Sequence, residues 1–219
     1  MLTSKRVMNL IKSWFAYRRE CINRCNKKRL TNFTPTLICS NCTGGMIYHW
    51  LGLQFRSPFI NLWMTNEDFL LALESFDDFI NTPLLCDKKY SEQYNYPVGI
   101  GFGGVRVFFM HYKSWGEAIA KWNQRVKRID RDNMAVMLTN FNGFTCGGGM
   151  SIIKRFEALP FKHKVIFVDR PIPDVGCAVH LKRWKPESRH VFNTQHIDGR
   201  LYLDQFDYVE FINNLKSVQ

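Results

Sequence analysis

Hydrophobic and polar positions along the chain predict strands that alternate with helices. Short apolar runs bounded by polar or turn-forming residues are typical of buried strands, and they occur at 36–40, 134–139 and 164–168. Hydrophobic residues at helical spacing occur at 46–51, 65–80 and 152–159. This alternation predicts an α/β fold of the Rossmann-like three-layer kind, with a mainly parallel sheet and helices on both faces.

The middle of the chain carries two β-rich segments and a marked helix start. Residues 98–100 and 105–110 flank a glycine-rich turn and predict a hairpin. Ser114 and Glu117 form a capping-box pattern before a helix with Trp115, Ile119, Trp122, Val126 and Ile129 on one face. Residues 86–97 predict a loop, 170–200 a loop with short strands, and 208–215 a closing helix.

Residues 1–30 show a different helical pattern. One side of the predicted helix carries Val7, Ile11, Trp14, Phe15, Ile22 and Cys25. The opposite side carries Lys5, Lys12, Arg19 and Lys27, while Arg18 falls on the apolar side. We therefore divide the chain into a basic amphipathic helix, 1–30, and a single α/β domain, 31–219.

The net charge of +11 is concentrated in that helix, which holds nine basic residues against one acidic residue. A basic amphipathic helix with Trp and Phe on its apolar side suits the surface of an anionic membrane. The other interpretation is a helix that packs on the body with its charges in water. Specific nucleic-acid binding is not predicted, because the chain has no recognition motif and a basic helix alone attracts phosphate only non-specifically.

Composition narrows the class of protein. With 46% hydrophobic and 15% aromatic residues among 219, the chain has ample material for a core and is not globally disordered. It contains no apolar run long enough to cross a bilayer and no signal-peptide pattern. Seven cysteines at irregular spacing do not suggest a disulfide framework. We expect a cytoplasmic protein with reduced thiols, peripheral at the inner face of the cell membrane if the basic helix binds lipid.

Polar residues follow the predicted strands, and ligands of parallel sheets bind beyond the carboxyl ends of the strands. We therefore expect binding residues in the turn after the first strand and at the ends of the later ones. The candidates are Ser40, Asn41, Gly44, Gly45, Asn140 and Asp169.

Cys42 and His111 are the candidate catalytic residues. Cys42 precedes a predicted helix, whose N-terminus would stabilise a thiolate nucleophile, or the same turn would hold a phosphate or an oxyanion. The alternative is a buried Cys in a tight glycine turn. His111 ends a β-rich run, where it would act as a general base or as a structural side chain bonded to the backbone.

Arg125 and Arg128 lie three residues apart and would clamp phosphate groups, or else belong to a solvated helix face. Glu117 is interpreted as the cap partner rather than as an acid catalyst. Cys21, Cys25, Cys39 and Cys42 have zinc-like spacing, but the first two fall in a helix and Cys39 in a strand, so no metal is predicted. A redox role for Cys39 and Cys42 is a further alternative.

Three segments in order resemble a bacterial family that carries a domain of unknown function. They are Asn41-Cys42-Thr43-Gly44-Gly45, then His111-Tyr112-Lys113-Ser114 with Trp122, Arg125 and Arg128, then 155–161. Members of this family are often named exopolysaccharide biosynthesis protein or acetyltransferase. The chain departs from the family pattern at 39–42, and at Gly101–Gly104, where the family tends to have acidic residues. The second departure argues against a carboxylate role there.

The resemblance implies a transferase in exopolysaccharide or capsule biosynthesis, and most directly an O-acetyltransferase that uses acetyl coenzyme A on a sugar hydroxyl. Its substrate would be a glycan or a lipid-linked glycan. Two alternatives stay open, namely a non-catalytic nucleotide- or glycan-binding component of a synthesis complex, and a glycosyl or phosphoryl transferase.

Overall fold

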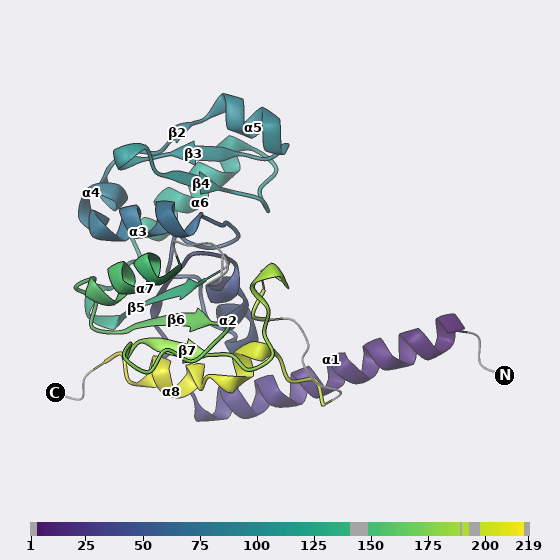
Figure 1. The fold of residues 1–219 in the computed structure, drawn as a ribbon. Coiled ribbons are helices and arrows are strands. Elements are labelled where there is room, and N and C mark those ends of the chain that lie inside the picture. The colour runs from purple at the N-terminus through teal and green to yellow at the C-terminus, as the bar shows by residue number, and fades with distance from the viewer. Residues whose placement is uncertain (1–3, 141–148, 189, 193–197, 217–219) are drawn as a thin grey trace.

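A four-stranded parallel sheet forms the centre of the computed structural model, which describes residues 4–140, 149–188, 190–192 and 198–216 (Figure 1). Its strands are β1 (Thr36–Cys39), β5 (Met134–Thr139), β6 (Lys164–Val168) and β7 (Ala178–His180), and they lie in that order. Each neighbouring pair is parallel. The order runs in one direction from β1, without the reversal that creates a switch point in doubly wound sheets.

Both faces of this sheet are covered, because successive side chains of a strand point to opposite sides. Ile38 of β1 belongs to one hydrophobic cluster, whereas Leu37 and Cys39 belong to the other. The first cluster includes residues of α3 (Asn66–Glu74), α4 (Phe76–Asn81), α6 (Trp115–Val126) and α7 (Gly149–Ala158). The second includes residues of α2 (Thr43–Leu51) and α8 (Tyr208–Asn213). The predicted α/β class with helices on both faces of a parallel sheet is therefore present.

A small antiparallel sheet sits on the far side of the α3, α4 and α6 layer (Figure 1). It consists of β2 (Leu85–Cys86), β3 (Val98–Ile100) and β4 (Arg106–Phe108), in that order. The pairing of β3 with β4 confirms the predicted hairpin. The predicted loop at 86–97 is wrong, because it contains α5 (Lys88–Tyr94), whose first turn is capped by the Asp87 side chain.

The helix predicted from residue 65 to 80 is two helices, α3 and α4, separated at Ser75. Thr65 caps α3 by accepting a hydrogen bond from the Asp68 N–H, as its position before two acidic residues indicates. At α6, Ser114 accepts from the Glu117 N–H and the Glu117 carboxylate accepts from the Lys113 N–H. The cap role of Glu117 is thereby confirmed.

The basic N-terminal helix is α1 (Ser4–Arg29), and it crosses the body on the side of α2 and α8 before projecting beyond it (Figure 1). In the second half of the helix Asn23 is buried, while Val7, Leu10 and Ile11 in the first half are exposed. Thus α1 packs on the body along part of its length only. Within the described residues, the search for a helix that is both long and apolar enough to span a bilayer finds none.

Candidate functional site

Cys42 and His111 line the same pocket, which has a volume of about 500 Å³. Its walls come from four segments, namely α2, residues 55–61, the turn after β4 and residues 190–192. The lining residues are Cys42, Gly45, Met46, His49, Phe55, Asn61, Met110, His111, His190 and Phe192. A cavity of this size with an apolar wall and a few polar groups is typical of a small-ligand site.

A larger hollow of about 790 Å³ lies next to residues 130–134 and 160–163. Since β5 begins at Met134 and β6 at Lys164, that hollow is at the amino ends of the strands. Ligands of parallel α/β sheets bind at the opposite edge, where Cys42 follows β1. The pocket of Cys42 and His111 is therefore the better candidate, despite its smaller volume.

The start of α2 is held against β1 by close packing. A Cβ on Gly44 would lie only 2.7 Å from the Cys39 sulfur, so glycine is required for the helix to approach the strand. The Asn41 carboxamide accepts a 2.9 Å hydrogen bond from the Thr43 N–H. Gly44 and Asn41 thus stabilise the turn without lining the pocket, whereas Gly45 is one of the lining residues. Of the predicted turn, Cys42 and Gly45 line the pocket, and the phosphate role of the turn stays a prediction.

Cys42 is neutral at physiological pH. Burial raises the pKa of its thiol to about 11, and its sulfur lies 3.8 Å from the Leu62 carbonyl oxygen. The stabilisation expected from the helix N-terminus is outweighed by loss of water around the sulfur. The buried thiol of Cys39 behaves alike, because burial raises its pKa above the ordinary value. Neither thiol is the activated nucleophile that the sequence suggested for Cys42.

The turn that carries His111 is fixed by its neighbour Tyr112. The Tyr112 phenol donates a 3.0 Å hydrogen bond to the Ile60 carbonyl oxygen and accepts a 2.6 Å bond from Arg125. His111 itself is exposed in the turn, while Tyr112 is buried beneath it. This arrangement leaves the imidazole accessible on a backbone that is anchored to the segment of Asn61.

Arg125 and Arg128 lie outside the pocket lining and contact residues that support it, so the structure does not bring the predicted phosphate clamp into this pocket. Arg125 is 7% exposed, and its guanidinium also lies 5.2 Å from the centre of the Phe55 ring. Arg128 donates a 2.9 Å hydrogen bond to the Phe55 carbonyl oxygen. The Arg125 guanidinium is buried and therefore needs the acceptor that Tyr112 supplies, whereas Arg128 is only half-buried. Arg125 and Arg128 hold residues 55–61 beside α6.

The other predicted binding residues lie at the carboxyl edge of the sheet, outside the pocket lining. Ser40 accepts from the Thr139 N–H at 3.3 Å, and Asn140 accepts from the Asn66 side chain at 3.1 Å. Asp169 is mostly buried, with one carboxylate oxygen 3.9 Å from Arg170. The Ser40 contact ties β1 to β5, which makes it structural.

Among the residues that the structure describes, five buried polar atoms at this edge lack a hydrogen-bond partner, which is unusual in a folded protein. They are Asn41 Nδ2, Thr43 Oγ1, Asn66 Oδ1, Asn140 Nδ2 and Asp169 Oδ1. Both donors and acceptors are among them. An amide N–H can donate to a hydroxyl oxygen, and an amide or carboxylate oxygen can accept from a hydroxyl O–H, so these groups are suited to hydrogen bonds with a polyol. The edge next to the pocket therefore has unused capacity for polar recognition.

His49, Asn61 and His190 are pocket residues that the sequence interpretation missed. His49 could have been found, because it lies seven residues after Cys42 on the same face of α2 as Gly45 and Met46. Asn61 has a φ of 61°, a left-handed conformation that Asn tolerates better than most residues. His190 stacks on Phe192 in an irregular segment, where no periodic pattern marks it.

The zinc-like spacing of cysteines does not correspond to a cluster. Cys21 and Cys25 lie on α1, whereas Cys39 is buried in β1. Among the residues that the structure describes, no group of three or more His, Cys, Asp and Glu side chains is arranged to hold a metal ion. The three histidines of the pocket are consequently candidates for proton transfer or ligand contact.

The fold and pocket define an α/β protein with a parallel sheet and a ligand-sized pocket at the start of α2. Residues 14–213 match a family model described as "Domain of unknown function (DUF1919)", and the chain belongs to this family. It is also similar to a Haemophilus influenzae protein named "Uncharacterized protein". The two are 37% identical over 195 residues, which cover 88% of this chain and 91% of the relative.

Proposed function

We propose that the protein is a transferase that modifies a hydroxyl group of a glycan, with the pocket of Cys42 and His111 as the place of reaction. The observation that carries this proposal is that both residues, 69 positions apart in the sequence, line one pocket. The family resemblance of these motifs supplies surface-polysaccharide assembly as the setting and acyl transfer as the reaction.

His111 is the general base of this proposal. An exposed imidazole at the pocket wall accepts the proton of a sugar hydroxyl, which makes the oxygen a better nucleophile. His49 and His190 line the same pocket and are placed to contact other hydroxyl groups of the sugar.

Cys42 is an uncharged lining residue of the pocket in this proposal rather than a nucleophile. Its thiol pKa of about 11 leaves it protonated at neutral pH. Phe55 and Phe192 add apolar rings to the same wall, and Asn61 adds an amide. Aromatic rings beside amide groups suit a sugar, which presents apolar ring faces and hydroxyl edges.

Acetyl coenzyme A is the proposed donor, but the predicted clamp for its phosphates does not fit this structure. Arg125 donates to Tyr112 and Arg128 to the Phe55 carbonyl oxygen, and neither side chain lines the pocket in which His111 lies. We therefore assign no residue to the donor and derive no step through it.

Thermal shift tests the proposal, because a ligand that binds only the folded state raises its stability. The purified full-length protein is screened against acetyl coenzyme A, N-acetylglucosamine and nucleotide sugars, and acetyl transfer to each sugar is measured. We expect stabilisation by a sugar in the wild type and loss of transfer in His111→Ala. The matched control is His180→Ala, on β7 and outside the pocket. This variant should keep both the stabilisation by the sugar and the acetyl transfer.

A non-catalytic glycan-binding component is the second candidate function. The neutral Cys42 thiol and the structural use of both arginines favour it, since they remove two of the predicted catalytic or cofactor roles. Under this alternative a sugar stabilises the protein but no acetyl transfer occurs. His111→Ala then weakens sugar binding and changes no activity.

A further inference from the structure

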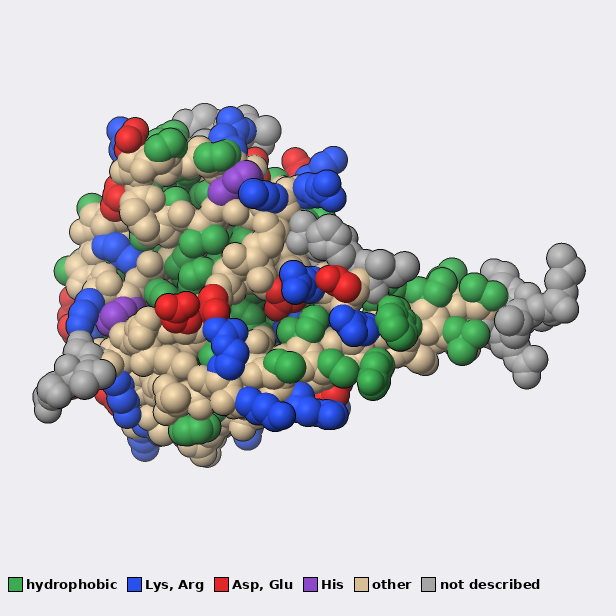
Figure 2. Space-filling view, turned by 90° about the horizontal axis from the view of Figure 1, so that it is seen from below, with side chains coloured by type: hydrophobic (Ala, Val, Ile, Leu, Met, Phe, Trp, Pro, Cys, Tyr) green, Lys and Arg blue, Asp and Glu red, His purple; other side chains and the backbone are tan. Residues whose placement is uncertain are grey.

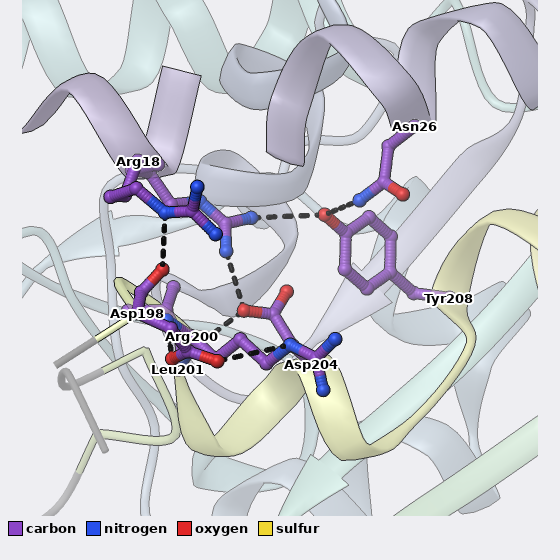
Figure 3. Close-up of polar contacts among 8 residues, drawn as sticks. Arg18, Asn26, Asp198, Arg200, Leu201, Asp204 and Tyr208 are labelled. Carbon is purple, nitrogen blue, oxygen red and sulfur yellow. Dashed lines mark hydrogen bonds and ion pairs between the residues drawn. The ribbon is translucent and has the colours of Figure 1, made fainter. Parts of the chain in front are cut away.

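α1 consists of two parts with different surroundings. Its second part is anchored to the C-terminal segment by polar contacts (Figure 3). Arg19 donates to Asp204 at 2.6 Å and to the Tyr208 phenol at 3.1 Å, and Asn26 donates to the same phenol at 2.8 Å. The Arg19 guanidinium also lies 4.2 Å from the centre of the Trp50 ring of α2.

The face of α1 that packs on the body is therefore polar. Arg19, Asn23 and Asn26 lie on it, and Asn23 is 6% exposed. The sequence left open whether this helix packs on the body or lies on a membrane. Arg18, which falls on the side with the apolar pattern, also contacts the body, because it donates to the Asp198 carbonyl oxygen. The C-terminal segment thus offers α1 oxygen acceptors, among them Asp204 and the Tyr208 phenol.

Apolar side chains of the first half of α1 are exposed and face away from the anchored contacts. Val7, Leu10, Ile11, Trp14 and Tyr17 follow helical spacing and form one stripe, which we call the outer stripe. At 100° per residue, its centre lies about 150° round the helix from the anchored face. Leu10 is 60% exposed and Tyr17 is 61% exposed. Figure 2 shows hydrophobic groups along the part of α1 that projects from the body.

The charge of α1 indicates which kind of partner the outer stripe binds. Residues 4–17 include Lys5, Arg6 and Lys12 and no acidic residue, and Glu20 is the single acid in α1. A second copy of the helix would carry the same net positive charge, and like net charge opposes association. An anionic lipid surface neutralises them while its acyl boundary accepts the apolar side chains.

We infer that the outer stripe of α1 docks on an anionic lipid surface, with the helix lying in the plane of the interface. Docking leaves the polar face bonded to the body, so it requires no rearrangement of the Arg19 contacts. The same C-terminal segment supplies His190 and Phe192 to the pocket and Asp198 and Asp204 to α1. This inference does not depend on the proposed function.

Vesicle co-sedimentation of the full-length protein tests it. We expect binding to phosphatidylcholine vesicles that contain phosphatidylglycerol, little binding to pure phosphatidylcholine, and release by high salt, since salt screens surface charges. The double variant Leu10→Glu/Ile11→Glu should bind at least about tenfold more weakly, because both side chains would carry charge into the interface.

The matched control is Leu71→Glu/Leu85→Glu, which places the same charges on exposed leucines of α3 and β2. We expect it to bind like the wild type apart from a small electrostatic loss. Equal binding by the two double variants, or no binding of the wild type to the anionic vesicles, would overturn the inference. So would light scattering that finds a dimer in the wild type and a monomer in Leu10→Glu/Ile11→Glu, because the stripe would then seat a second copy.

Discussion

The Arg125 guanidinium donates a 2.6 Å hydrogen bond to the Tyr112 phenol, and the two side chains are 7% and 8% exposed. Burial raises the pKa of Tyr112 above its ordinary value, while the Arg125 charge partly offsets the effect. The phenol therefore stays protonated and donates onward to the Ile60 carbonyl oxygen. Through this relay, α6 fixes both the His111 turn and the segment that carries Asn61.

Tyr112→Phe should destabilise the protein, because it leaves the buried guanidinium without an acceptor. Hydrogen bonds to charged groups contribute about 1.5–3 kcal/mol, so we expect the free energy of unfolding to fall by that amount. Urea denaturation measures it. Tyr17→Phe, at an exposed phenol, is the control and should stay within about 0.5 kcal/mol of the wild type. Equal stability of the two variants would mean that the Arg125 contact is unimportant.

Gly44→Ala should loosen the contact between α2 and β1. The new Cβ would lie 2.7 Å from the Cys39 sulfur, and overpacking of a core costs about 1–3 kcal/mol. Gly45→Ala is the matched control, because its Cβ would be 3.5 Å from its nearest neighbour. Adding Cys39→Ala to Gly44→Ala makes room and should restore part of the loss. Absence of any rescue would contradict a steric cause.

Cys42 should be slow to alkylate near neutral pH and should react faster as the pH approaches 11. Burial raises its thiol pKa from the ordinary 9.0 to about 11, so the folded state retains a proton that the unfolded state loses. Its contribution to stability is thus present below pH 9 and is lost as the pH rises through about 11. Mass spectrometry of iodoacetamide-labelled peptides measures the rate, with exposed Cys25 as the internal reference. Rapid labelling of Cys42 at neutral pH would restore the thiolate hypothesis.

Gly199→Ala should weaken the anchoring of α1. Gly199 has a φ of 81°, and a Cβ there would lie 2.7 Å from the Cβ of Arg18. Gly104→Ala is the matched control, since its φ is 79° and nothing lies within 4 Å. Both variants carry the left-handed backbone cost of about 1–2 kcal/mol, and only Gly199→Ala adds the clash. The rate of amide hydrogen exchange of residues 18–29 should rise in Gly199→Ala alone. An equal rise in both variants would contradict a close contact between Gly199 and α1.

Local sequence patterns were sufficient to predict the central strands of the parallel sheet but not the polar contacts between distant residues. The apolar runs of β5 and β6 were predicted with the bounds that the structure has, because a strand buried on both faces has few polar positions. Arg125 was interpreted as a phosphate ligand or as part of a solvated face, although it lies three residues after buried Trp122 and is itself buried. A charge on a helix suggests solvent, and only the tertiary partners Tyr112 and Phe55 reverse that expectation.

The anchored face of α1 could not be predicted for a similar reason. Periodicity indicates which side of a helix is apolar, but the partner surface decides which side packs. That surface comes from residues 198–208, which are distant in sequence and lack a regular pattern. In the pocket, Cys42 follows β1 of the parallel sheet and His111 follows β4 of the small sheet, whereas His190 comes from an irregular segment without a sequence signal.

The most direct test of the central claim is NMR of the histidine side chains in the full-length protein, titrated with the sugar that gives the largest thermal shift. We expect the His111 and His49 resonances to move together with a single affinity and the His180 resonances to stay unchanged. Asn61→Leu should weaken the affinity. Movement of His180 or His163 while His111 stays fixed would contradict the assignment of this pocket as the functional site.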